Sequence, residues 1–189
     1  GIERKRMAFV YASSGQQLVK AMASDGMEWN QGATGGITYE GRNAAYAAPE
    51  GAFVYFKRYV LIHEGAHLFQ ICLNSEMWNT PVWYFEGIAD SVSQHVWEAS
   101  TKHLTVHVLD KMTNNNYYGE GVNILRSEQG KGLTPHKVHL DNGAARGINL
   151  LMVHYFTDDP LRAQKFRIWR DELFRLALRG SAQQAASDR

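Results

Sequence analysis

The sequence lacks the features that mark several large classes of protein. Its single cysteine, Cys72, excludes a disulfide bond within the chain. No apolar run approaches the roughly 18 residues that a membrane-spanning helix needs, so no membrane span is expected. Lysine and arginine together number 20, aspartate and glutamate 19, and the two signs are mixed along the chain. Without a basic stripe, the electrostatic footprint of nucleic-acid binding is missing.

What remains is the composition of a globular protein. The chain has 189 residues, 44% of them hydrophobic, which is enough for one domain with a substantial core. We expect this domain to cover residues 1–180, with an N-terminal subdomain to about residue 75 and a helical one from 76 to 180. A flexible tail is expected over 181–189. The chain begins at Gly1 and not at Met, so a processed or excised fragment is expected.

The most informative feature is a histidine pair on a predicted helix. Residues 63–67 read HEGAH and lie in a mostly apolar stretch that predicts a buried helix of about twenty residues. His63 and His67, four positions apart, share a helix face and can direct two imidazoles at one metal ion. Glu64 lies beside that face, where a base for a metal-activated water molecule is needed. Such polar groups are costly in an apolar helix unless they are paired or bind a metal.

A second segment offers a third ligand. Thr80-Pro81 is typical of a helix start, and the helix is expected to run from about Pro81 to Glu98. Catalytic zinc takes three protein ligands and leaves one position open, so Glu86 is the natural third ligand. Asp90, one turn further on, is placed to accept a hydrogen bond from the second ring nitrogen of His63. The sequence therefore predicts one zinc ion per chain.

These two segments resemble the gluzincin zinc metallopeptidases of the peptidase MA-like superfamily, a group that includes thermolysin and the aminopeptidase N family. The resemblance depends on HExxH, then eighteen residues, then a glutamate within residues 83–90, WYFEGIAD. Bacterial peptidases of uncharacterised function are similar in both segments and in a later helix like residues 151–156, LMVHYF. The resemblance covers roughly residues 36–178. It implies zinc ligands at His63, His67 and Glu86, a general base at Glu64, and a supporting carboxylate at Asp90.

One position departs from the gluzincin pattern. That group usually places a Tyr or His roughly 60 to 70 residues after the glutamate ligand, where it stabilises the oxyanion. In this chain the position where relatives often carry Tyr aligns with Arg146. Arg146 can donate to an oxyanion, bind a substrate carboxylate or lie on the surface. His154 and Tyr155 lie at the same spacing and are alternative candidates for the oxyanion-stabilising residue. Each of them can instead have only a core or surface role.

The remaining pattern predicts an α+β, zincin-like fold. We expect a small, partly antiparallel N-terminal sheet packed on the HExxH helix, a mainly helical C-terminal half, and the zinc cleft between them. The expected strands are 6–12, 37–39 and 43–48. The other expected helices are one that Ser13 or Ser14 caps and that ends at about Ser24, and those over 145–156 and 161–178. Residues 114–119 and 130–132 give loop signals. In gluzincins an edge strand before the HExxH helix binds the substrate backbone, and strand 43–48 is the candidate here.

The predicted function is zinc-dependent hydrolysis of peptide bonds, with a peptide or protein as the partner. Three alternatives stay open. The first is a zinc hydrolase of a non-peptide amide or of a glycosylated or cell-wall peptide. The second is a zinc-bearing binding module with weakened catalysis, and the third is a metal-free helix bundle. The resemblance also implies a chain that is exported or belongs to a larger protein.

Overall fold

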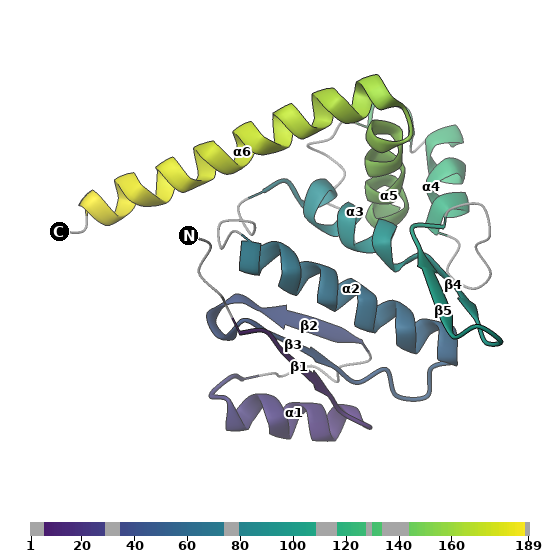
Figure 1. The fold of residues 1–189 in the computed structure, drawn as a ribbon, viewed down its shortest axis with the longest axis vertical. Helices are drawn as coiled ribbons and strands as arrows, with labels where there is room; N and C mark the ends of the chain where they lie inside the picture. The colour runs from purple at the N-terminus through teal and green to yellow at the C-terminus, as the bar shows by residue number, and fades with distance from the viewer. Residues whose placement is uncertain are drawn as a thin grey trace. The chain divides into compact units, whose positions relative to one another are not determined.

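A computed structural model describes residues 6–28, 35–73, 80–108, 117–127, 130–133 and 144–187. The fold is mixed α+β and mainly helical, with two small sheets (Figure 1). The chain divides into two compact units. The first comprises Gly1–Leu73 and Val92–Val108, and the second comprises Asn74–Ser91 and Leu109–Arg189. Across the described ranges, no helix is long and apolar enough to cross a membrane.

The first unit contains the predicted sheet, which is partly antiparallel as expected. Its strands are β1 (Ala8–Tyr11), β2 (Gly36–Tyr39) and β3 (Ala44–Ala47), in the order β1-β3-β2. β3 runs parallel to β1 and antiparallel to β2. The proposal of strand 43–48 as the substrate-binding edge is therefore wrong, because β3 has a neighbour on each side and is buried throughout. β2 is the edge strand that lies next to the HExxH helix.

Two helices lie on opposite faces of this sheet (Figure 1). α1 (Gly15–Ser24) is capped by Ser14, one of the two predicted caps, whose side chain accepts a hydrogen bond from the Gln17 amide. Leu18 and Met22 of α1 are buried against the sheet. α2 (Val54–Leu73) is the predicted HExxH helix of 20 residues, and it packs on β2 and β3. The sheet thus holds one face of α2 in place.

A β-hairpin completes the first unit, and its first strand lies where the sequence predicted helix. α3 (Val82–Ser93) ends five residues before Glu98, and β4 (His95–Glu98) pairs antiparallel with β5 (His103–Val106). Tertiary contacts of His95 explain the early end. Its buried ring stacks on Tyr55 with centroids 4.3 Å apart, and its Nε2 accepts from the Arg58 Nε at 3.2 Å. These contacts favour an extended chain over a continued helix.

The second unit is built from α3 and from α4 (Tyr117–Arg126), α5 (Ala144–Thr157) and α6 (Pro160–Ser187). α5 agrees with the prediction, whereas α4 was not predicted because residues 114–119 gave a loop signal. Gly121 permits a close contact between α4 and α5, since a Cβ there would lie 2.5 Å from the Gly147 carbonyl oxygen. α6 continues past the predicted end at residue 178, because its last residues include the helix formers Ala and Gln.

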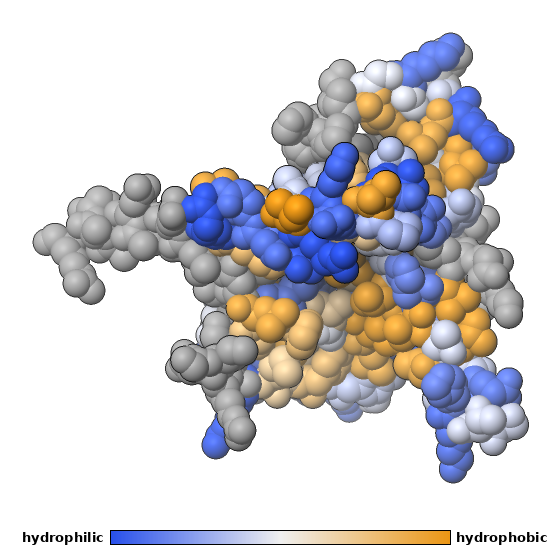
Figure 2. Space-filling model, turned by 45° about the horizontal axis from the view of Figure 1, so that its top comes forward, coloured by the Kyte–Doolittle hydropathy of each residue, from blue (hydrophilic) through white to orange (hydrophobic). Residues whose placement is uncertain are grey.

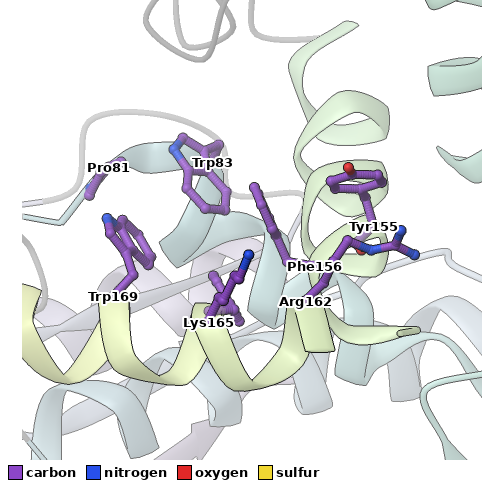
Figure 3. A pocket seen from close by; sticks show the side chains of 8 residues that line it. Pro81, Trp83, Tyr155, Phe156, Arg162, Lys165 and Trp169 are labelled. Carbon is purple, nitrogen blue, oxygen red and sulfur yellow. The ribbon is translucent and has the colours of Figure 1, made fainter. Parts of the chain in front are cut away.

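Aromatic rings form the packing between α3, α5 and α6. Trp83 lies with its centroid 5.7 Å from Phe156 and 5.3 Å from Trp169, and Phe156 stacks on Phe166 at 5.4 Å. A pocket of about 620 Å³ opens beside these rings, and Pro81, Tyr155, Arg162 and Lys165 complete its lining (Figure 3). The described surface of α6 is mostly hydrophilic, with isolated hydrophobic residues (Figure 2). That surface agrees with a solvated helix face.

Candidate metal centre

The first unit brings the two motif histidines together on α2. Both are buried, and their Nε2 atoms lie 3.0 Å apart with the rings nearly perpendicular, at 88°. Two nitrogens bound tetrahedrally to one zinc ion at about 2.0–2.1 Å would lie about 3.3 Å apart. The observed separation of the His63 and His67 nitrogens is close to that value. The ring of Tyr59 stacks on His63, with centroids 5.9 Å apart, and limits its rotation.

Gln70 orients the second histidine, and sequence reasoning missed it. Its side-chain oxygen lies 3.4 Å from Nδ1 of His67, and the residue is 8% exposed. With the Nδ1 proton donated to this oxygen, Nε2 of His67 is left as the ligand atom. The available signal was a glutamine three residues after His67 in an otherwise apolar helix.

The carboxylate of Glu64 is held by strand β2. Thr38 Oγ1 lies 2.8 Å from Glu64 Oε2 and 3.0 Å from the Glu64 backbone oxygen, and both residues are buried. The backbone of Gly36 approaches the same side chain, since a Cβ there would lie 2.5 Å from Glu64 Cγ. Sequence reasoning missed Thr38 and Gly36 because the strand and the helix meet only in the folded chain.

In the second unit, Gly87 allows α3, which carries Glu86 and Asp90, to pack closely on α5. A Cβ on Gly87 would lie 2.5 Å from the backbone oxygen of Asn149, so α3 and α5 pack with backbone contact. Asp90 is fully buried, and Arg146 donates to both its oxygens, from Nη2 at 2.5 Å and from Nε at 3.2 Å. The predicted hydrogen bond between Asp90 and His63 stays a prediction.

Arg146 also lies over an aromatic ring. Its guanidinium carbon is 5.2 Å from the centroid of Tyr117, and burial raises the pKa of this tyrosine. The other two candidates for the oxyanion have contacts of their own. His154 meets the ring of Tyr118 edge-on at 6.0 Å, and Tyr155 is covered by the Arg162 guanidinium at 4.4 Å. Oxyanion stabilisation by Arg146, His154 or Tyr155 stays a prediction.

His63, His67 and Glu86 form a group that could hold a metal ion. Each offers one ligand atom, and these atoms all lie within 4.8 Å of one another. Two imidazole nitrogens and a carboxylate oxygen are the donor set of many hydrolytic zinc sites. The chemistry of the residues thus fits zinc.

Comparison of the chain with protein-family models, with curated proteins and with solved structures finds no match. The functional interpretation therefore depends on the geometry of the site.

Proposed function

We propose that the protein is a zinc-dependent hydrolase of peptide bonds. The observation that carries the proposal is the pair of buried imidazole nitrogens 3.0 Å apart, with the carboxylate of Glu64 beside them on the same helix. A metal-free helix bundle has no need for two histidines and a glutamate at this spacing in a buried helix. The Glu86 carboxylate supplies the third donor.

The residues have separate roles in this mechanism. A zinc ion held by His63, His67 and Glu86 would make water more acidic and polarise the scissile carbonyl. Glu64 accepts the proton of the attacking water and later gives it to the leaving nitrogen. Thr38 donates to Oε2 of Glu64. We therefore assign to Oε1 the proton transfer from water and to the leaving nitrogen. Gln70 keeps His67 in the tautomer that leaves Nε2 as the ligand atom.

Strand β2 is the place for the substrate backbone in this proposal. The Gly35 oxygen accepts from the Ala48 amide, so Gly35, Ile37 and Tyr39 direct their backbone groups toward β3. The backbone groups of Gly36 and Thr38, the residues in between, point the other way, to the edge of the sheet that faces away from β3. Among the described strands none pairs with that edge. An extended peptide added there would form backbone hydrogen bonds beside Glu64.

The first experiment measures bound metal. We expect about one zinc per chain in the parent, most of it lost in Glu86→Ala and all of it kept in Glu64→Gln. Glu120→Gln, which changes an exposed glutamate on α4, is the matched control. A parent that holds no zinc after zinc is supplied and the excess removed would contradict the proposal.

The second experiment measures cleavage. A mixed peptide library is incubated with the parent and with Glu64→Gln, and mass spectrometry identifies the products. Loss of a general base lowers the rate by about 10²- to 10⁴-fold, so cleavage should nearly vanish in the variant while zinc stays bound. Equal cleavage by the parent and Glu64→Gln would show that Glu64 is not the base.

A further inference from the structure

We propose that Thr38 is a positioning residue for Glu64, and that it links the substrate-binding edge of the sheet to the alignment of the base. The inference rests on the proposed peptidase function, because it assigns Thr38 a task in that reaction. It depends on three observations: one hydrogen bond, one close backbone approach, and the register of β2.

The hydrogen bond is the first observation. The Thr38 hydroxyl lies 2.8 Å from Glu64 Oε2, with Thr38 4% exposed and Glu64 7% exposed. In the part of the chain that the structure describes, Thr38 alone donates to this carboxylate. A buried carboxylate with one donor takes its orientation from that donor. Thr38 therefore fixes which oxygen of Glu64 points away from the strand.

The approach of Gly36 is the second observation. A methyl group at this position would lie 2.5 Å from Glu64 Cγ and 3.0 Å from Glu64 Cδ. The missing side chain lets β2 come close enough for the hydroxyl of Thr38 to reach Oε2. Two residues of one strand thus confine the Glu64 side chain, one by contact with its carbons and the other by a hydrogen bond.

The register of β2 is the third observation. Gly36 and Thr38 direct their backbone groups to the outer edge, while the side chain of Thr38 points at α2. An extended peptide that pairs with the edge bonds to the same two residues that confine Glu64. Its binding therefore holds β2 against α2 and aligns the base when substrate is present. When a ligand does not pair with this edge, only β2 itself holds Glu64 in position.

The kinetic test uses two variants of Thr38. Thr38→Val keeps the shape and removes the hydroxyl, whereas Thr38→Ser keeps the hydroxyl. A misplaced catalytic group costs about 10²-fold, so we expect Thr38→Val to lose about 10- to 100-fold in kcat with KM changed less than about 3-fold. Thr38→Ser should recover most of this loss. Thr105→Val, at an exposed threonine of β5, is the matched control, and zinc content is measured for each variant.

A second test does not depend on activity. The hydroxyl has one proton and two acceptors, the Glu64 carboxylate at 2.8 Å and the Glu64 backbone oxygen at 3.0 Å. Thermal unfolding shows which acceptor matters. It is measured for the parent, Thr38→Val, Glu64→Ala and the double variant. If the carboxylate is the partner, Thr38→Val should lower the midpoint by about 5 °C in the parent and by less than about 2 °C when Glu64 is alanine.

The outcomes distinguish this inference from the function on which it rests. Equal shifts of the midpoint in both backgrounds would assign the hydroxyl to the backbone oxygen and overturn the inference. So would a kcat of Thr38→Val within about twofold of the parent, with zinc bound. A parent that binds zinc but cleaves no peptide of the library overturns the peptidase proposal instead. The unfolding comparison then still decides whether Thr38 holds Glu64.

Discussion

Replacing Arg146 by methionine tests the ion pair between Asp90 of α3 and Arg146 of α5. The change keeps much of the aliphatic stem and removes the guanidinium group. Asp90 is fully buried, whereas the Arg146 side chain is 32% exposed. The variant therefore leaves a buried carboxylate without the two hydrogen bonds that Arg146 donates.

The size of the effect follows from this burial. Removing one partner of a buried ion pair costs about 3–5 kcal/mol. Because water reaches about a third of the Arg146 side chain, we expect the low end of that range, about 3 kcal/mol. For a chain of this length each kcal/mol lowers the unfolding midpoint by about 2–4 °C, so the expected fall is about 6–12 °C.

Thermal and denaturant unfolding of the parent and of Arg146→Met measure this effect. Arg162→Met is the matched control, since Arg162 pairs with Asp158 and both side chains are well exposed, at 37% and 47%. Such a surface pair contributes less than about 1 kcal/mol. The double variant Asp90→Asn with Arg146→Met should regain part of the loss, because it removes the buried charge. Equal shifts for Arg146→Met and Arg162→Met would refute the reasoning.

Three further predictions concern single residues. Gly87→Ala should destabilise the protein by about 1–3 kcal/mol or more, because the new methyl group would lie 2.5 Å from the Asn149 backbone oxygen; denaturant unfolding measures this. Burial lowers the pKa of His95, so the unfolded chain binds this proton at higher pH than the folded chain does. The free energy of unfolding should therefore fall as the pH drops below about 6.5, and His95→Gln should flatten the profile between pH 5 and 7.5. Gln70→Leu should weaken zinc binding by about 10- to 100-fold in a chelator competition, because His67 loses its Nδ1 acceptor.

Local geometry was enough to predict one part of the site, the histidine pair. His63 and His67 lie one helical turn apart, so a correct helix prediction was enough to bring their imidazoles together. The same local reasoning located α1 with its Ser14 cap, and α5. It was wrong for residues 95–98, where the contacts of His95 with Tyr55 and Arg58 outweigh the local preference.

Contacts between distant segments could not be predicted in this way. The sequence separates Thr38 from Glu64 by 26 positions, and Arg146 from Asp90 by 56. Arg146 is the clearest case: its alignment with the gluzincins suggested an oxyanion donor as one of three roles, and the structure shows that its Nε and Nη2 donate to one buried carboxylate. Pairing with Asp90 and donation to a substrate are two separate roles for this guanidinium. Activity separates the two roles: a purely structural Arg146 predicts that Arg146→Met, assayed well below its unfolding midpoint, keeps the kcat of the parent.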